Sequence, residues 1–289
     1  MSKPRLGKLG LWSIELRFGG KEESDTAAAE LESLGFDTLW VPGGVDDKVL
    51  ETVDALLAAT NSATIATGIL NIWKHKPQEV AQWFKALPAD RQSRVMLGLG
   101  VSHGPIIGDA WKKPLAVTRR FLDDLDQSGM PRDNLCLAAL GPKMLELSRD
   151  RTTGAHPYLV TPDHTAKARD ILGPNKLLAP EQGIVLESSP TKARELARQA
   201  LSIYQNLPNY RNNWLRHGLT QADIDTLSDR LVDALFAWGS AQRIAERLRA
   251  HYDAGADHVC VQVIRGPRGG DMAGLLSACR ELTAAINAG

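Results

Sequence analysis

The chain has 289 residues, and its 34 lysines and arginines balance its 34 aspartates and glutamates, so the formal net charge is zero. This balance argues against nucleic-acid binding through bulk charge and against docking on a membrane through a polybasic segment. Hydrophobic residues make up 43% of the chain and charged residues 24%, which is typical of a globular protein and excludes a disordered one.

The sequence has no apolar run long enough to cross a bilayer, and the charged start is followed by no secretory apolar segment. Three cysteines, Cys136, Cys260 and Cys279, have neither the number nor the spacing of a disulfide framework or a zinc site. No histidine pair has the spacing of a metal-binding motif. We therefore expect a cytoplasmic protein with buried free thiols, no metal site, and no membrane or nucleic-acid partner.

Short apolar segments alternate with amphipathic segments along the chain. The apolar segments predict strands at 6–13, 37–42, 63–73, 94–103, 134–140, 155–161, 183–187 and 258–264. The amphipathic segments predict helices at 24–34, 49–60, 77–87, 114–127, 143–151, 163–172, 190–205, 226–238, 240–252 and 273–286. A polar and aromatic stretch lies at 207–225 and predicts a helix or loop over one end of the fold.

Eight strand–helix units in strict order fit either a closed barrel or a doubly wound open sheet. The turn after the first strand, residues 13–21, lacks the G-x-G-x-x-G pattern of a dinucleotide-binding sheet, and the chain has no P-loop. The sequence therefore predicts an α/β fold of the (β/α)8 TIM-type barrel. We expect one domain over residues 1–289, with a helical insertion at about 206–238 before the last βα unit.

In such a barrel the site lies in the loops that follow the strands. These loops hold many glycines and several aromatic residues but few acids and bases, with His103 as the imidazole and Glu187 as the carboxylate. This composition suits a flat, mostly apolar cofactor that is held largely by main chain. Trp40 and Trp73 lie at strand ends, where a flat ligand would stack.

Five segments resemble the luciferase-like monooxygenase superfamily and, within it, the oxidoreductases of actinobacteria that use the deazaflavin coenzyme F420. The segments are 36–42 (FDTLWVP), 66–70 (ATGIL), 94–101 (RVMLGLGV), 138–158 (AALGPKMLELSRDRTTGAHPY) and 250–263 (AHYDAGADHVCVQV). They run through nearly the whole chain in the order of the family. The family has a TIM-type barrel, so the resemblance implies the fold that the alternation of segments also predicts.

The resemblance implies a cofactor ring that lies against the ends of the third and fourth strands. Gly68 and Ile69 match a peptide bond that is often cis in the family and backs the central ring. His103 matches the position of a glutamate acid in the sugar-phosphate dehydrogenases of the family, and it is the candidate catalytic residue. The expected cofactor contacts are Trp40, Gly68, Ile69, Gly100, Val101, Ser102, Ala139, Leu140, Gly141 and Pro142, and the expected substrate contacts are Trp12, Trp73 and Tyr158.

The turn Leu140-Gly141-Pro142 begins a helix, whose free N–H groups and positive dipole end suit a phosphate. In the family this turn contacts the phosphodiester of the cofactor, although relatives usually have a second glycine where this chain has Leu140. A further departure follows the second strand, where the dehydrogenases place an Asp-His pair and this chain has Pro42-Gly43-Gly44-Val45. The base of those enzymes is therefore not available here.

The resemblance implies an F420-dependent oxidoreductase that transfers hydride to or from a small organic substrate. Two alternatives stay open: an FMN-dependent luciferase-like monooxygenase, and a degenerate, cofactor-free barrel that acts as a binding protein, which the two departures favour. Similar proteins are usually dimers, so a homodimer is possible. The aromatic segment 209–214 is expected to form either a lid over the barrel or a subunit contact.

Overall fold

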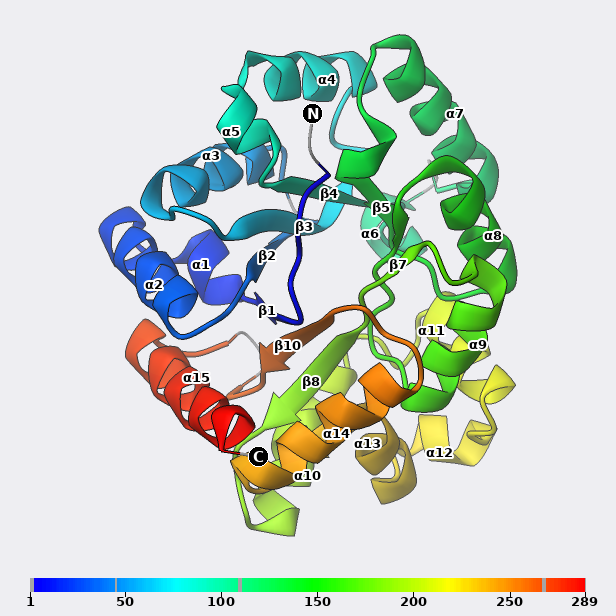
Figure 1. Cartoon of the computed structure of the whole chain (residues 1–289). Coiled ribbons are helices and arrows are strands. Elements are labelled where there is room, and N and C mark those ends of the chain that lie inside the picture. Colours follow the sequence, from blue (N-terminus) through cyan, green and yellow to red (C-terminus); the bar gives the residue numbers. More distant parts are fainter. Residues whose placement is uncertain (1–2, 45, 109–110, 267–268, 289) are drawn as a thin grey trace.

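The computed structural model describes residues 3–44, 46–108, 111–266 and 269–288. Within them parallel strands alternate with helices around a barrel, as the sequence predicts (Figure 1). The strands are β1 Leu9–Trp12, β2 Thr38–Gly43, β3 Thr64–Asn71, β4 Val95–Gly100, β5 Leu135–Leu137, β6 Gly154–Ala155, β7 Leu177–Leu178, β8 Glu181–Val185, β9 Phe236–Trp238 and β10 Val259–Val263.

Six of the longer helices begin with proline at their first position, where the missing N–H has no partner to lose. The predicted helix at 114–127 has the same bounds in the structure. The helices are α1 Ile14–Phe18, α2 Lys21–Ser33, α3 Val49–Ala59, α4 Pro77–Ala86, α5 Ala89–Gln92, α6 Gly104–Ile107, α7 Pro114–Gln127, α8 Pro142–Arg151, α9 Pro162–Leu172, α10 Pro190–Leu201, α11 Pro208–Arg216, α12 Gln221–Asp225, α13 Asp229–Leu235, α14 Ala241–Asp253 and α15 Met272–Asn287, with a 3-10 turn at Arg132–Asn134.

The strands follow the order β7-β6-β5-β4-β3-β2-β1-β10-β8-β9 among the described residues. Two residues, Ala179 and Pro180, join β7, at one end of this order, to β8, which pairs with β10 near the other end. Ala179 N donates to Ala155 O at 2.9 Å on the β6 side, and Cys260 N donates to Pro180 O at 2.9 Å on the β10 side. The strands thereby close into the predicted TIM-type barrel.

Both faces of the barrel strands are buried, which explains why the strand segments are apolar almost throughout. The outer face packs against the helices, for example through Leu97 and Leu99 of β4. The inner face carries large side chains such as Trp40 and Met96 among small neighbours such as Ala66 and Cys136. All three cysteines are free and buried, as expected.

The insertion differs from the prediction at its end. The expected helix at 226–238 is wrong: α13 stops at Leu235, and Phe236–Trp238 form β9, which pairs in parallel with β8. No glycine or proline marks this boundary until Gly239, so the helical pattern runs on in the sequence. Burial decides the structure, because all three residues of β9 pack into the core.

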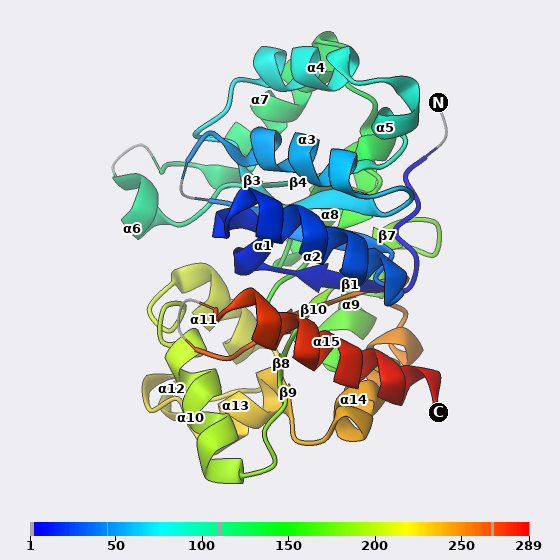
Figure 2. The same ribbon diagram turned by 90° about the vertical axis from the view of Figure 1, so that its left-hand side faces the viewer.

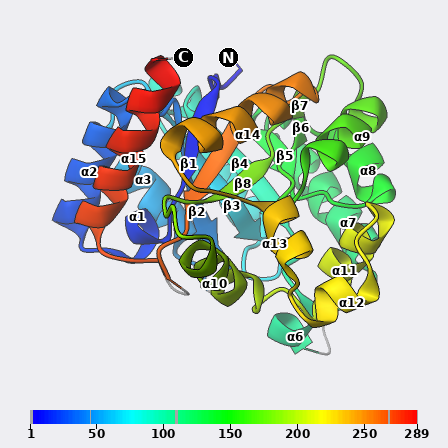
Figure 3. The ribbon, with the colours of Figure 1, turned by 90° about the horizontal axis from the view of Figure 1, so that it is seen from below.

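The carboxyl ends of the strands meet at the end of the molecule that lies opposite the two chain termini. Figure 2 shows α6 and α11 at this end, and Figure 3 shows α10 to α13 grouped beside α6. We call this end the mouth. Among the described residues, no helix has both the length and the apolar character that a membrane crossing requires.

Candidate functional site

Main chain reaches the surface of the mouth at the ends of β3, β4 and β5. Gly68 and Ile69 are half-buried, and so are Val101, Ser102 and Gly141. The Gly68–Ile69 peptide bond is cis, as the resemblance implies. Since these segments come from neighbouring strands, they form one continuous line across the mouth.

Other predicted contacts lie below that line or beside it. Gly100 and Ala139 are buried, and a Cβ on Gly100 would lie 2.8 Å from Ile69 Cγ1. Trp73 is half-buried, and its indole Nε1 donates to Val101 O at 2.8 Å. Trp73 therefore holds the end of β4 in place.

Trp12, at the end of β1, packs directly on Gly68. Its indole Nε1 donates to Gly68 O at 2.7 Å. A Cβ on Gly68 would lie 2.7 Å from Trp12 Nε1 and 3.1 Å from His156 Nε2. Only glycine allows this close approach, and Trp12 thereby forms one wall of the mouth.

Trp40 does not reach the mouth, which corrects its expected role in stacking on the cofactor. Its ring is fully buried inside the barrel and stacks on His156, with centroids 4.0 Å apart. Trp40 Nε1 donates to His258 Nε2 at 3.1 Å. Since Nε2 accepts, His258 Nδ1 carries the proton and donates to Gly7 O at 3.2 Å. Burial lowers the pKa of His156 to about 4 and that of His258 to about 3.

Three tyrosines from distant parts of the chain meet over the mouth, and we call Tyr158, Tyr204 and Tyr210 the tyrosine cluster. Their ring centroids lie 5.0–6.3 Å apart. His103 lies against this cluster, 5.6 Å from the ring of Tyr210. Burial lowers the pKa of His103, so its ring is neutral near pH 7, and its buried Nδ1 has no hydrogen-bond partner among the described residues.

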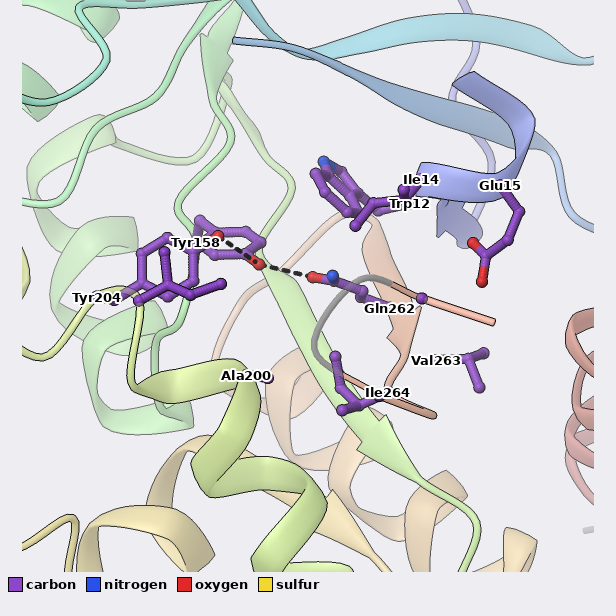
Figure 4. Close-up of a pocket in the computed structure, with 12 residues that line it drawn as sticks. Trp12, Ile14, Glu15, Tyr158, Ala200, Tyr204, Gln262, Val263 and Ile264 are labelled. Carbon is purple, nitrogen blue, oxygen red and sulfur yellow. Dashed lines mark hydrogen bonds between the residues drawn. The ribbon is translucent and has the colours of Figure 1, made fainter. Parts of the chain in front are cut away.

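An open cavity lies beside the tyrosine cluster, between β1, β10 and α10 (Figure 4). Trp12 and Tyr158 line it next to each other, with ring centroids 6.0 Å apart and ring planes tilted by 46°. Tyr204 OH donates to Tyr158 OH at 3.3 Å, and Tyr158 OH donates to Gln262 Oε1 at 2.7 Å. Of the predicted substrate contacts, Trp12 and Tyr158 line this cavity and Trp73 does not.

The N-terminus of α8 forms an open, positively charged corner of the mouth. A Cβ on Gly141 would meet only Arg216 Nη1, at 4.0 Å. Leu140 O accepts a hydrogen bond from His164 Nε2 at 2.9 Å, and Pro142 is exposed at the first turn. Helix N-termini of this kind bind anions, and the guanidinium of Arg216 adds a full charge.

A family model described as luciferase-like monooxygenase matches residues 21–128, which span α2 to α7. Over this part of the chain the sequence is similar to that family. No curated protein matches it.

Several solved structures share this fold over almost the whole chain. An F420-dependent secondary alcohol dehydrogenase in complex with an F420–acetone adduct is 16% identical over 98% of this chain and 99% of its own, with a TM-score of 0.73. The coenzyme F420-dependent tetrahydromethanopterin reductase of Methanopyrus kandleri is 14% identical over 98% and 99%, also at 0.73.

The oxygenating component of the 3,6-diketocamphane monooxygenase of Pseudomonas putida, a type II Baeyer–Villiger monooxygenase in complex with FMN, is 13% identical over 98% of each chain at 0.66. The TM-scores show that this chain shares its fold with these proteins. The titles of the three structures name different cofactors, F420 for two and FMN for the third.

Three residues at or near the cavity were not among the residues predicted from the sequence. Tyr204 and Gln262 line the cavity, and Gln262 is the polar residue within the apolar segment of β10. Glu181 lies in β8, two residues before the predicted start of that strand. A polar side chain inside an apolar strand was the signal available for both Gln262 and Glu181. The predicted carboxylate Glu187 instead accepts a hydrogen bond from Ser189 N at 2.7 Å, just before α10.

Glu181 is a fully buried carboxyl group next to the tyrosine cluster. Its Oε2 accepts a hydrogen bond from Leu159 N at 3.0 Å, and its Oε1 has no partner among the described residues. Burial raises its pKa to about 8. No cluster of side chains that could hold a metal ion is present in the described part of the chain.

Proposed function

We propose that this chain is an F420-dependent oxidoreductase that transfers hydride between the deazaflavin and a small organic substrate. The observation that carries the proposal is the line of accessible main chain from Gly68 to Gly141, which ends beside Arg216. The fold shared with two F420-dependent enzymes supports the choice of cofactor. The proposal takes residues 1–289 as one domain, of which 1–2, 45, 109–110, 267–268 and 289 lie outside the described residues.

The residues present fit such a cofactor. Gly68 and Ile69 offer half-buried main chain to a flat ring, next to the indole of Trp12. Gly141 leaves open the N-terminus of α8 for an anionic tail, with Arg216 as the paired cation. When bound, the deazaflavin supplies the carbon that gives or takes a hydride.

His103 is the proton donor or acceptor in this proposal. Its ring lies at the mouth against the tyrosine cluster, and its buried Nδ1 has no hydrogen-bond partner among the described residues, which leaves it able to hold or release a proton. Replacing His103 with Gln should reduce kcat by about 100-fold, the usual size of a general acid–base contribution, and leave the Kd for F420 unchanged. An unchanged kcat would remove His103 from the mechanism.

Titration of the purified protein with F420 and, separately, with FMN tests the cofactor. A cofactor that binds the native state stabilises it by about 2.7 kcal/mol at a concentration of 100 times its Kd, which a thermal melt detects. F420 should raise the unfolding temperature and change its own absorbance spectrum on binding.

Stabilisation by FMN alone would contradict the deazaflavin and favour the FMN-dependent monooxygenase, a candidate that the structure of the FMN-bound relative supports. No stabilisation by either cofactor would favour the cofactor-free binding barrel. Sedimentation of the same sample tests the proposed homodimer.

A further inference from the structure

The cavity beside the tyrosine cluster has a wall that is apolar and aromatic apart from a small polar centre. Trp12, Tyr158 and Tyr204 supply the aromatic surface, and Ile14, Ala200, Val263 and Ile264 supply the aliphatic surface (Figure 4). A compact, mainly apolar molecule fits such a wall.

The polar centre is the amide of Gln262, whose orientation is fixed by two hydroxyl groups. Tyr204 OH donates to Tyr158 OH, and Tyr158 OH donates to Gln262 Oε1. The oxygen of the amide is therefore used, and the Nε2 group makes no hydrogen bond within the described part of the chain. Because Gln262 lines the cavity, its N–H groups are donors for an oxygen atom of a ligand.

The charged groups at the edge of the cavity already have partners. Glu15 Oε2 accepts from Ser13 Oγ at 2.8 Å, and Glu15 Oε1 accepts from Gly270 N at 3.1 Å and from Arg265 Nη2 at 3.3 Å. Arg265 also donates to the main-chain oxygen of Asp271. Among the described residues at the cavity, none offers a free counter-charge, so a charged ligand would lose its hydration there without compensation from them.

We propose that this cavity is the substrate site, that it selects uncharged carbonyl compounds or alcohols with a compact apolar body over anions such as phosphorylated sugars, and that Gln262 Nε2 donates to the substrate oxygen. The assignment of the cavity to a substrate rests on the proposed function. Gln262 is the binding residue, and Tyr158 and Tyr204 position its amide.

The test uses two probes of similar shape that differ in charge, cyclohexanone and cyclohexanecarboxylate. Calorimetric titration of the full chain is run both without cofactor and with saturating F420. We expect cyclohexanone to bind in at least one of the two states, and at least ten times more tightly than the carboxylate. Carboxylate binding equal to or tighter than ketone binding, or no ketone binding in either state, would overturn the proposal.

Variants locate the contact. Gln262→Leu keeps the size of the side chain and removes the donor, so the Kd for cyclohexanone should rise at least tenfold. Tyr158→Phe keeps the aromatic wall but frees the amide to rotate, and it should raise the Kd by a smaller factor. Gln221→Leu is the matched control, because Gln221 lies on exposed α12 and pairs with Asp225. Thermal melts establish that each variant is folded.

An unchanged Kd in folded Gln262→Leu would overturn the role of this residue, and Tyr158→Phe then provides an independent check of the same amide. The outcome of the cofactor titration is independent of this test. Absence of F420 binding together with ketone binding that depends on Gln262 would contradict the proposed oxidoreductase and leave the carbonyl site standing.

Discussion

Replacing Glu181 with Gln should change how the stability of the protein depends on pH. The carboxyl group is 1% exposed, and burial raises its pKa from 4.5 to about 8. The folded state therefore favours the protonated form. As the pH rises above 4.5 the unfolded chain loses this proton while the folded chain keeps it, so the free energy of unfolding falls until about pH 8.

The magnitude follows from the same two values. The difference between 4.5 and about 8, at about 1.36 kcal/mol for each pH unit, corresponds to about 5 kcal/mol. Gln is neutral at every pH and can still accept the hydrogen bond from Leu159 N. Glu181→Gln should therefore be close to the wild type in stability at pH 4.5 and more stable by up to about 5 kcal/mol at pH 8.5.

Urea unfolding of the two proteins at pH 4.5, 6.5 and 8.5 measures this difference. The exposed Glu246→Gln on α14 is the matched control, and it should show no such trend. Contributions from the buried histidines are common to both proteins and cancel. A difference in unfolding free energy that stays constant from pH 4.5 to 8.5 would refute the reasoning that Glu181 is protonated in the folded state.

Three further predictions concern the barrel and its mouth. Gly68→Val should destabilise the fold by about 1–3 kcal/mol and weaken F420 binding, because a Cβ at this position lies 2.7 Å from Trp12 Nε1. Gly44→Val is the control, since a Cβ there has nothing within 4 Å, and it should leave the melting temperature and F420 binding unchanged. Arg216→Met should raise the Kd for F420 at least tenfold in a fluorescence titration and reduce the dependence of that Kd on salt. Burial lowers the pKa of His156 and of His258, so their contribution to stability is complete above pH 6.5 and is lost as the pH falls toward 4. In His258→Gln the free energy of unfolding should therefore fall less between pH 6.5 and pH 4 than in the wild type. An equal fall in both proteins, measured by denaturant unfolding, would contradict this.

Most helices of the fold could be predicted from the periodicity of apolar residues and from the positions of proline. Pro77 and Pro114 mark helix starts that the structure has at the same residues. The short strand β6 and the split between β7 and β8 carry little pattern of their own, because two residues give no periodicity and Pro180 interrupts the pairing. Their positions depend on closure of the barrel, which is a property of the whole chain.

The site was only partly predictable. Gly68 was proposed from the family resemblance alone, whereas Gly141 also stands at a predicted helix start, which a local pattern can indicate. The position of the Trp40 side chain could not be predicted from local sequence. A residue near a strand end points either into the barrel or over its mouth, depending on the stagger of the strands, and Trp40 is fully buried in the barrel. The tyrosine cluster joins Tyr158 to Tyr204 across 46 positions, and such a meeting becomes visible only in three dimensions.

The parallel pairing of β9 with β8 has a consequence for how this protein can change. Gly183 pairs with Phe236 and Val185 with Trp238, so the chain leaves the barrel and returns to it at the same height, on adjacent strands. Residues 186–235 are therefore a cassette that is anchored at two neighbouring points. Replacing this segment with a different one would alter one side of the cavity beside the tyrosine cluster without disturbing barrel closure. We expect selectivity in proteins of this design to diverge fastest in that segment.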